Sequence, residues 1–456
     1  MRLSALENRH VAILGFGAEG QAAYRLLKSR LKRCNVTIIE ENSDHAAAQR
    51  FPADPATTLL TGPLHGHDLT RFDVVIKSPG ISPYRPEIRR AMAQGTHFTS
   101  GTQLWCDEHP QARLIVVTGT KGKSTTASLI AHLLNGAGRR TELIGNIGKP
   151  ALEAWSPDPK PEFWVMELSS YQATGLRCHA EVALLLNLYP EHTDWHGSTE
   201  RYYRDKTQFM LAPGVRTIIL EHDGQNLPRP IAGSHKRVHY NDPNGIHVRE
   251  DGIYLGQRRV VDATGLPLPG AHNLLNGCAA LTVIDRLGID IETVLPAMKD
   301  FRGLAHRLAS LGFRNGVEYI DDSISTTPQS ALAALKSFPD RPCTLLLGGY
   351  DRDLDWHDFA RASRNTTLHR VVTLPENGER IAAALAKEHP TLPVIKADGM
   401  ADAVAHAARA TPPGGTIILS PGAPSYGNYR DFRERGKDFA RCAGLWENED
   451  RAPAKE

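Results

Sequence analysis

The sequence lacks a long apolar run. Its 456 residues contain no stretch approaching the roughly 18 apolar residues that a membrane-spanning helix needs. Residues 1–7 also lack the apolar core of a secretory signal peptide. These two absences favour a cytoplasmic protein with no membrane partner.

The sequence also lacks a large excess of either positive or negative charge. Lysine and arginine together number 53, and aspartate and glutamate number 51, which leaves a net charge of +2. Nucleic acids and anionic membrane surfaces attract clustered positive charge. The balance therefore gives no support to a nucleic-acid partner, and we expect a monomer.

Cysteine is scarce and widely spaced. The six cysteines include no CxxC pair, which favours free thiols over a zinc site or a disulfide framework. Hydrophobic residues make up 41% of the chain and charged residues 23%, as in ordinary globular proteins. At roughly 100–200 residues per domain, the length predicts about two to four domains.

The most informative stretch is the glycine-rich loop at residues 118–125, Thr-Gly-Thr-Lys-Gly-Lys-Ser-Thr. It lies between a β-rich run and an apolar segment of helical character. In such loops backbone N–H groups surround phosphate oxygens, and the N-terminus of the next helix faces the same anion. Lys123 can reach the terminal phosphates, and Ser124 can help to hold Mg²⁺. Only two residues separate Gly119 from Gly122, fewer than in the common P-loop. The surrounding strand and helix nevertheless favour a nucleoside triphosphate site rather than a turn that binds nothing.

A second glycine pattern follows the first predicted strand. Gly15, Gly17 and Gly20 have the spacing of a dinucleotide fingerprint, and Glu40 ends the next strand. The pattern alone is weak. It is compatible with the diphosphate of a UDP-sugar, with a nicotinamide cofactor or with a structural turn, and the triphosphate loop favours the UDP-sugar over hydride transfer.

Two polar residues follow apolar strands near the triphosphate loop. Glu167 ends the run 163–167, and His192 follows the run 182–188. A carboxylate and an imidazole at neighbouring strand ends indicate a metal-assisted phosphoryl site. The alternatives are a helix-capping Glu167 and a structural His192. From the residues alone, Lys206 is an ordinary helix lysine, and Arg307 is either a linker cation that reaches a phosphate or a surface arginine.

Three blocks of alternating strand-like and helix-like segments predict an α/β fold with parallel sheets of the doubly wound type. We expect domains at residues 1–109, 110–308 and 309–456. A more irregular β-rich region is expected at about 235–270. The remaining β-rich runs are at residues 10–14, 36–40, 73–77, 217–220, 317–321, 343–347, 370–374 and 416–419.

Taken together, these motifs resemble the Mur ligase family of ATP-dependent amide ligases, and within it the glutamate-adding members. The resemblance spans nearly the whole chain, in order. It includes Glu191-His192-x-Asp194 and Gly303-Leu304-x-His306-Arg307. The other matching motifs are Gly15–Gly20, Ser78-Pro79-Gly80, Thr118–Thr125, Gly145-Asn146, Glu167–Gln172, His272-Asn273-x-x-Asn276, Asp322-Ser323, Gly348-Gly349 and Ser420-Pro421.

The resemblance implies a three-domain architecture: a Rossmann-like N-terminal domain for the UDP-sugar, a central P-loop ATPase-like domain and a Rossmann-like C-terminal domain for the amino acid. It implies ATP and Mg²⁺ as cofactors, and UDP-N-acetylmuramoyl-L-alanine and glutamate as substrates of peptidoglycan precursor synthesis. Lys206 matches a lysine that is carbamylated in members of the family. The resemblance also implies four catalytic residues: Lys123, His192, Lys206 and Arg307.

The other expected roles are shared by groups of residues. Nucleotide binding is expected from Gly119, Thr120, Lys121, Gly122, Lys123, Ser124, Thr125, Asn276, Arg307 and Asp322. Metal binding is expected from Ser124, Glu167, His192 and Lys206. Substrate binding is expected from Gly15, Gly17, Gly20, Glu40, Ser78, Gly80, Asn146, Ser169, Gln172, Thr326, Arg352, Ser425 and Phe432.

The implied reaction has two steps. The substrate carboxylate attacks the γ-phosphate of ATP and forms an acyl phosphate. This first step releases ADP from its bond to the γ-phosphate. The glutamate amine then attacks the carbonyl of the acyl phosphate, and phosphate leaves. Both steps develop charge on crowded anions, so metal ions, Lys123 and Arg307 are expected to supply most of the stabilisation.

The chain departs from the family pattern at specific places. Lys121 stands where the family usually has Asn or His, and Glu191 where it usually has Asp. The amino-acid end differs most: Ile324 and Arg352 stand where the D-glutamate enzymes usually have lysines, and Ser420-Pro421-Gly422-Ala423-Pro424-Ser425 replaces their usual segment. Because arginine binds a carboxylate differently from lysine, we favour L-glutamate, with D-glutamate as the alternative. More remote alternatives are a nicotinamide oxidoreductase, a non-catalytic ATP-binding module and a folylpolyglutamate synthase.

Overall fold

The computed structural model describes residues 1–41, 51, 54, 56–224, 235–265, 271–301, 303–351 and 353–446. Contacts divide the chain into two compact units, Met1–Phe301 and Arg302–Glu456, and each is described by itself. Within the described residues, no helix combines the length and the apolar character required to cross a bilayer.

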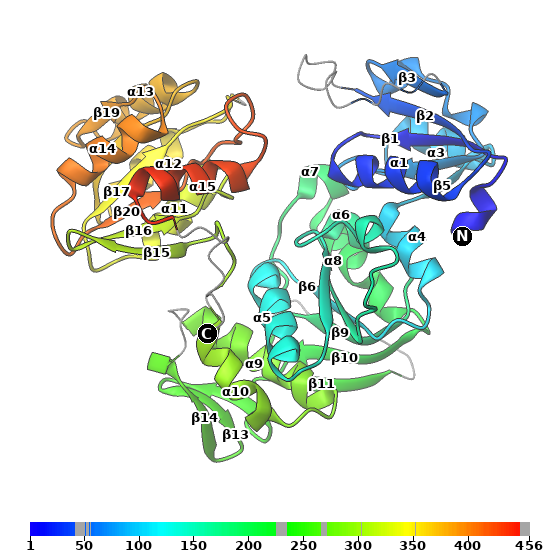
Figure 1. Ribbon diagram of the computed structural model, residues 1–456, viewed down its shortest axis with the longest axis horizontal. Helices are drawn as coiled ribbons and strands as arrows, with labels where there is room; N and C mark the ends of the chain where they lie inside the picture. Colours follow the sequence, from blue (N-terminus) through cyan, green and yellow to red (C-terminus); the bar gives the residue numbers. More distant parts are fainter. Residues whose placement is uncertain are drawn as a thin grey trace, which may run out of the picture. The chain divides into compact units, whose positions relative to one another are not determined.

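The first unit begins with a five-stranded parallel sheet (Figure 1). Its strand order is β3-β2-β1-β4-β5, so that the order reverses between β1 and β4 as in doubly wound folds. The strands are β1 (His10–Leu14), β2 (Asn35–Glu40), β3 (Thr57–Thr61), β4 (Val74–Lys77) and β5 (His97–Thr99). The connecting helices are α1 (Ala18–Arg30), α3 (Pro86–Ala93) and α4 (Gly101–Glu108).

A second parallel sheet follows, with six strands in the order β11-β10-β9-β6-β8-β7. Its four inner strands, β10, β9, β6 and β8, are mostly apolar and buried, as expected for a sheet covered on both faces. The strands of this sheet are β6 (Leu114–Thr118), β7 (Thr141–Gly145), β8 (Phe163–Glu167), β9 (Ala180–Leu185), β10 (Val215–Glu221) and β11 (Lys236–Tyr240). The short helices around it are α6 (Ser170–Ala173), α7 (Thr193–His196) and α8 (Thr199–Thr207).

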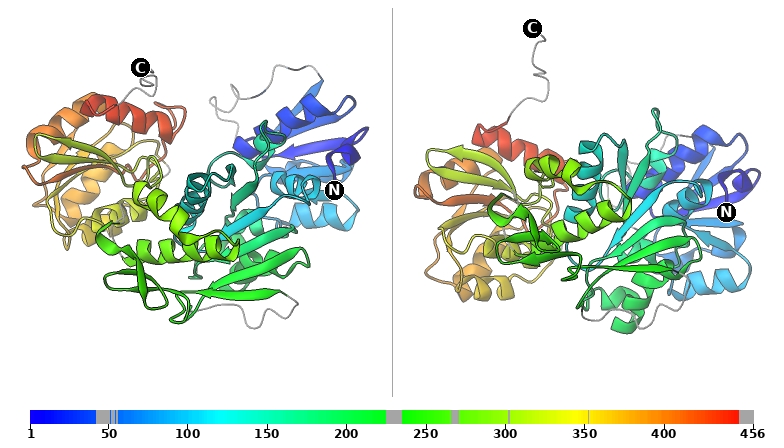
Figure 2. Two further views of the ribbon diagram at one scale, coloured as in Figure 1. Left: turned by 60° about the horizontal axis from the view of Figure 1, so that its bottom comes forward. Right: turned by 90° about the horizontal axis from the view of Figure 1, so that it is seen from below.

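Three longer helices pack together beside this sheet: α5 (Lys123–Gly136) contacts both α9 (Ala271–Arg286) and α10 (Ile291–Asp300) (Figure 1, Figure 2). The small antiparallel sheet of β12 (Ile246–Arg249), β13 (Gly252–Leu255) and β14 (Arg258–Asp262) contacts α9. This sheet accounts for the irregular β-rich region that the sequence indicates; residues 266–270 at its end lie outside the described residues.

The first two sheets share one hydrophobic core. Buried side chains from both, among them Val11 and Val116, belong to the same cluster. Trp105 of α4 is 0% exposed, and its ring lies 5.0 Å from the ring of Trp164 on β8. The indole N–H of Trp105 also donates to the carbonyl of Ala154, at 3.3 Å. This packing joins the first sheet to the second.

The second unit holds a six-stranded sheet in the order β15-β16-β20-β17-β18-β19, parallel except for the β15–β16 hairpin. The strands are β15 (Ala309–Arg314), β16 (Val317–Asp321), β17 (Cys343–Leu347), β18 (Leu368–Thr373), β19 (Val394–Lys396) and β20 (Thr416–Leu419). Its helices are α11 (Pro328–Lys336), α12 (His357–Ser363), α13 (Gly378–Glu388), α14 (Met400–Ala410) and α15 (Phe432–Ala443).

The predicted strand at residues 182–188 is too long. In the structure β9 ends at Leu185, because the following main chain turns toward the glycine-rich loop. The N–H of Leu186 donates to the carbonyl of Thr118, at 3.0 Å, and the carbonyl of Asn187 accepts from the N–H of Thr120, at 2.9 Å. The apolar run therefore continues past the strand to support the loop.

Candidate active site

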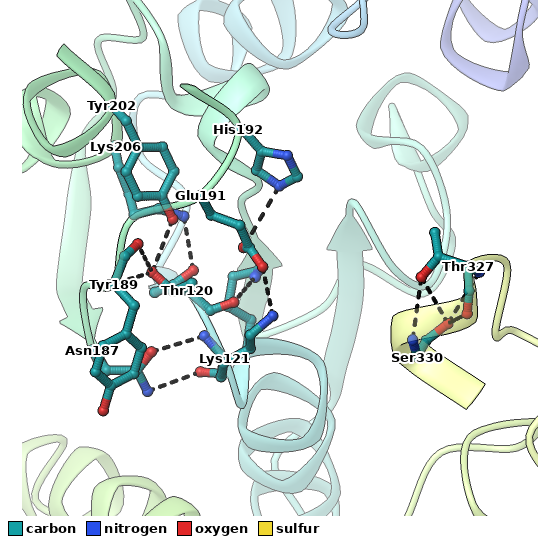
Figure 3. A network of polar contacts seen from close by, with 12 residues as sticks. Thr120, Lys121, Asn187, Tyr189, Glu191, His192, Tyr202, Lys206, Thr327 and Ser330 are labelled. Atoms are coloured by element: carbon teal, nitrogen blue, oxygen red, sulfur yellow. Dashed lines mark hydrogen bonds and ion pairs between the residues drawn. The ribbon is translucent and has the colours of Figure 1, made fainter. Parts of the chain in front are cut away.

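Three neighbouring strand ends build the site. Strands β9, β6 and β8 are adjacent and parallel, so their carboxyl ends meet at one edge of the second sheet. Strand β6 delivers the glycine-rich loop, β8 delivers Glu167, and the chain after β9 delivers residues 187–192. Figure 3 shows Thr120 and Lys121 of the loop facing Asn187, Glu191 and Lys206. This edge, at the reversal of strand order, is where doubly wound sheets bind ligands.

Two glycines allow the loop to curl. Gly119 has φ +150° and Gly122 has φ +82°, conformations that side chains disfavour. A Cβ on Gly122 would lie 2.5 Å from Oδ1 of Asn276 on α9. Helix α5 begins at Lys123, directly after Gly122, with no side-chain cap at its N-terminus. Such an uncapped helix start offers backbone N–H groups to a phosphate.

The side chains of the loop are held in place. The Lys123 ammonium donates to the carbonyl of Thr120, at 2.9 Å. The hydroxyl of Thr120 lies 2.9 Å from the hydroxyl of Tyr202. The side-chain oxygen of Asn187 accepts from the N–H of Lys121, at 2.8 Å. These three contacts give the loop a defined shape.

The structure brings together two of the predicted metal ligands, Ser124 and Glu167. The hydroxyl of Ser124 donates to one carboxylate oxygen of Glu167, at 3.1 Å, and the side-chain amide of Asn146 donates to the other, at 3.2 Å. Glu167 is 0% exposed, and both of these donors are neutral. A buried carboxylate beside a hydroxyl and an amide offers the hard oxygen ligands that Mg²⁺ prefers. Among the described residues no group of three or more His, Cys, Asp and Glu side chains gathers in a way that could hold a metal by itself.

Lys206 lies beneath the same loop. Its ammonium donates to the carbonyl of Gly119, at 2.8 Å, and lies 5.0 Å from the ring centre of Tyr202. The side chain is almost completely buried. Burial, reinforced by the nearby Lys123 ammonium, lowers the pKa of Lys206 to about 7. From the residues alone this lysine could not be singled out, and only the family resemblance predicted it as a site residue.

His192 lies at the start of α7 with a left-handed backbone, φ +54°. Its Nδ1 lies 3.0 Å from the hydroxyl of Tyr171, and its Nε2 lies 3.6 Å from a carboxylate oxygen of Glu191. Burial lowers the pKa of His192, which favours the neutral, metal-binding imidazole. Glu191 also pairs with Lys121. The two departures from the family pattern in this region therefore contact each other.

The glycine fingerprint of the first sheet is stabilised by the residues predicted with it. Gly15 has φ +85°, and its carbonyl accepts from the hydroxyl of Ser78, at 2.8 Å. The N–H of Phe16 donates to the carboxylate of Glu40, at 2.7 Å. A Cβ on Gly20 would lie 2.1 Å from the carbonyl oxygen of Gly15. These contacts bring Gly15, Gly20, Glu40 and Ser78 together, and Gly17 is the N-cap residue of α1.

Residues of the short helices beside the second sheet contact the start of α1 and the loop after β4. Ser169 and Gln172 form a capping box at the start of α6. The side-chain amide of Gln172 also donates to the carboxylate of Glu19, at 2.6 Å. The indole N–H of Trp195 donates to the carbonyl of Gly80, at 2.8 Å. Sequence reasoning missed Glu19 and Trp195 because their partners are distant in the chain.

In the second unit, the predicted nucleotide-binding residue Asp322 has hydrogen-bond partners on both carboxylate oxygens. One carboxylate oxygen accepts from the Ser420 hydroxyl, at 2.6 Å, and the other from the N–H of Leu308, at 3.2 Å. Burial raises the pKa of Asp322 to about 6. The N–H of Arg307 donates to the carbonyl of Leu304, at 3.2 Å, in the turn before β15.

The predicted amino-acid-binding residues of this unit that the structure describes lie on separate segments of the chain. Ser425 is buried after β20, and Phe432 begins α15 with its ring 5.9 Å from that of His306. Thr326 is half-buried in the loop before α11. Arg352 lies outside the described residues. A cavity of about 430 Å³ beside Ser425 is lined by Gly349 and Arg435, among others.

Arg435 was not predicted from the sequence. Its buried guanidinium donates to the carbonyls of Ser323, Ala423 and Pro424, at 2.8, 3.0 and 3.1 Å. It thereby fixes the loops after β16 and β20, the two loops that carry Asp322 and Ser425.

Comparison with known proteins identifies the family of the chain. Three family models match: the MurD-like N-terminal domain of Mur ligases at residues 9–100, the Mur ligase middle domain at 117–284, and the glutamate ligase domain of Mur ligases at 306–423.

Two relatives align over almost the whole chain. A UDP-N-acetylmuramoyl-L-alanine–L-glutamate ligase of Xanthomonas axonopodis pv. citri (strain 306) is 44% identical over 459 residues, covering 98% of this chain and 97% of the relative. An enzyme of the same name from Xylella fastidiosa (strain Temecula1) is 42% identical over 457 residues, with 98% and 97% covered.

Solved structures share the fold. The UDP-N-acetylmuramate–alanine ligase MurC of Thermotoga maritima aligns with a TM-score of 0.58 at 16% identity, covering 95% of this chain and 98% of that one. With all three domains matched in order and two relatives aligned nearly end to end, this chain belongs to the Mur ligase family.

Proposed function

We propose that this protein is an ATP-dependent ligase that joins L-glutamate to UDP-N-acetylmuramoyl-L-alanine. One observation carries the proposal: the triphosphate loop, the Ser124–Glu167 pair and the buried Lys206 converge at one edge of the second sheet. The two relatives named for this reaction support the choice of substrates.

The loop at residues 118–125 is the proposed phosphate site. The N-terminus of α5 and the Lys123 ammonium would stabilise the charge that develops on the γ-phosphate as it is transferred. Asn276, packed against Gly122, would define the nucleotide side of this loop. Arg307 and Asp322 are also proposed to bind the nucleotide.

Ser124, Glu167 and His192 are the proposed Mg²⁺ ligands. When bound, Mg²⁺ neutralises phosphate charge and orients the phosphate oxygens. Asn146 holds the carboxylate of Glu167 in position, at 3.2 Å. The hydroxyl of Tyr171 orients the ring of His192.

Lys206 is proposed to be carbamylated. With a pKa of about 7, much of its amine is neutral at physiological pH. The neutral nitrogen can attack the carbon of CO₂, forming an N–C bond while one N–H proton passes to solvent. The resulting carbamate would carry a negative charge in place of the ammonium's positive one and would help to orient a metal ion, while its remaining N–H would still be able to donate to the carbonyl of Gly119.

The first sheet is the proposed site of the sugar nucleotide. The loop of Gly15, Gly17 and Gly20 would receive the diphosphate, since its backbone N–H groups lie at the start of α1. Glu40 and Ser78 form hydrogen bonds with this loop. Gly80 is a further proposed substrate contact, and Asn146, Ser169 and Gln172 would extend the site toward the substrate's carboxylate. Thr326, Arg352, Ser425 and Phe432 are proposed to bind the incoming glutamate.

The reaction would follow the two steps expected from the family. The alanine carboxylate of the substrate attacks the γ-phosphorus, the bond to ADP breaks, and an acyl phosphate forms. The amine of glutamate then attacks the acyl carbon, loses a proton and expels phosphate. The residues of this site bind and align the reactants rather than form a covalent bond to them.

Phosphate release from ATP tests the proposal. With UDP-N-acetylmuramoyl-L-alanine present, release should require glutamate and should strongly prefer the L-enantiomer. Lys123→Ala should lose the activity while keeping the wild-type melting temperature. Equal or greater turnover with D-glutamate would overturn the stereochemical assignment, and release that does not depend on glutamate would overturn the ligase assignment.

A further inference from the structure

A buried polar network joins the two sheets of the first unit. One carboxylate oxygen of Asp205 on α8 lies 2.7 Å from Nδ1 of His196, whose Nε2 lies 3.0 Å from the Ser170 hydroxyl. The hydroxyl of Tyr84, from the loop after β4, donates to the Asp205 carboxylate at 2.7 and 2.8 Å. We call Tyr84, Asp205, His196 and Ser170 the junction network.

The serine, histidine and aspartate of this network have the connectivity of a nucleophilic triad, but they are not one. His196 is 0% exposed and Ser170 is 3% exposed, so no substrate carbonyl can reach the hydroxyl. Within the network the histidine has partners on both ring nitrogens. The network instead holds together the elements that carry these residues: α6, α7, α8 and the loop after β4.

A second set of contacts fastens the same two segments. The indole of Trp195 donates to the carbonyl of Gly80, and the hydroxyl of Ser82 donates to the carbonyl of Trp195 at 3.0 Å. The rings of Trp195 and Tyr84 meet edge to face, 6.3 Å apart. The loop at residues 78–84 is therefore tied to the segment at 195–205 by polar contacts from several residues.

The two ends of this connection matter for the reaction. At one end, Ser78 holds the carbonyl of Gly15 in the proposed diphosphate loop. At the other end, Asp205 directly precedes Lys206, whose ammonium holds the carbonyl of Gly119 in the triphosphate loop. A displacement of the loop at 78–84 would pull on the helix that carries Lys206, because a carboxylate that lost the Tyr84 hydroxyl would be left buried with fewer donors.

We propose that the junction network couples occupancy of the first sheet by the sugar nucleotide to the position of Lys206 beneath the triphosphate loop. Tyr84, Asp205, His196 and Ser170 are thus positioning residues for the ligation reaction. The inference rests on the proposed function, because it assigns the sugar nucleotide to the first sheet.

The test compares Tyr84→Phe with Tyr203→Phe. The first removes only the hydroxyl that bonds Asp205 and keeps the ring against Trp195. The second removes a hydroxyl from the same helix, α8, outside the junction network, and serves as the matched control. Hydrogen exchange is measured in peptides covering residues 15–20, 78–84 and 199–207, with and without UDP-N-acetylmuramoyl-L-alanine, and steady-state kinetics are measured in parallel.

In wild type and Tyr203→Phe, the sugar nucleotide should slow exchange in all three peptides. In Tyr84→Phe it should slow exchange at 15–20 and 78–84 but no longer at 199–207. The kcat of this variant should fall about five- to tenfold, at the lower end of the range of couplings between sites, with an unchanged KM for ATP. Exchange and kinetics of Tyr84→Phe equal to those of the control would overturn the inference alone. Absence of protection at 15–20 and 78–84 in wild type would overturn the proposed sugar-nucleotide site and the inference with it.

Discussion

Replacing Gly122 by alanine should damage both the fold and the nucleotide site. The residue has φ +82°, and an alanine there costs about 1–2 kcal/mol in backbone strain. Its Cβ would also lie 2.5 Å from Oδ1 of Asn276, which is buried on α9. Overpacking of this kind costs about 1–3 kcal/mol more. We therefore expect Gly122→Ala to lower the free energy of unfolding by about 2–5 kcal/mol.

A matched control separates the two contributions. Gly175 has φ +75°, but no heavy atom lies within 4 Å of where its Cβ would stand. Gly175→Ala should therefore show the strain without the collision. Urea unfolding gives both free energies, and titration with ATP gives both affinities; only Gly122→Ala should weaken ATP binding, because only that variant displaces Asn276. If the two variants were equally destabilised and bound ATP equally well, the collision with Asn276 would not exist and the reasoning would be wrong.

Three further predictions follow from charged groups. The fraction of Lys206 carrying a ¹³C-carbamate, measured by NMR at fixed dissolved ¹³CO₂, should rise between about pH 6 and about pH 8, because the neutral amine dominates above its pKa of about 7; a signal independent of pH would contradict this. Asp322 has its pKa raised from 3.8 to about 6, so the folded state binds its proton more tightly and stability should fall by about 3 kcal/mol as pH rises from about 4 to about 6. Asp322→Asn should remove this pH dependence of the free energy of unfolding. An unchanged dependence would show that another group causes it. Lys121→Asn removes an exposed ion pair with Glu191 and should change the free energy of unfolding by less than about 1 kcal/mol; a larger loss in urea unfolding would show that the pair is stronger than its exposure implies.

Residues that follow apolar strands were predictable from the sequence. The glycine-rich loop follows such a strand and Glu167 ends another, and parallel strands bring their carboxyl ends to one edge. Their meeting there, with Ser124 bonded to Glu167, needed only the strand assignments and the topology rule. The fold class was predictable for the same reason, because alternation of strands and helices is a local signal.

Residues whose partners are far away in the chain could not be found this way. Tyr84 and Asp205 are ordinary residues in local terms, and 121 positions separate them. Lys206 looks like a solvated helix residue until folding buries it beneath Gly119. The end of β9 was misjudged because the apolar run continues past it: Leu186 is buried in the core beside the sheet although it lies beyond the last residue of the strand. In each case tertiary contacts, not local pattern, set the outcome.

The packing of Trp105 against Trp164 limits where the chain can be divided into stable fragments. A cut near residue 109 would separate the two indoles and expose large apolar surfaces on both fragments, which favours aggregation. A cut after Phe301 leaves that shared interior whole. Fragments for labelling or crystallisation should therefore keep the first 301 residues together.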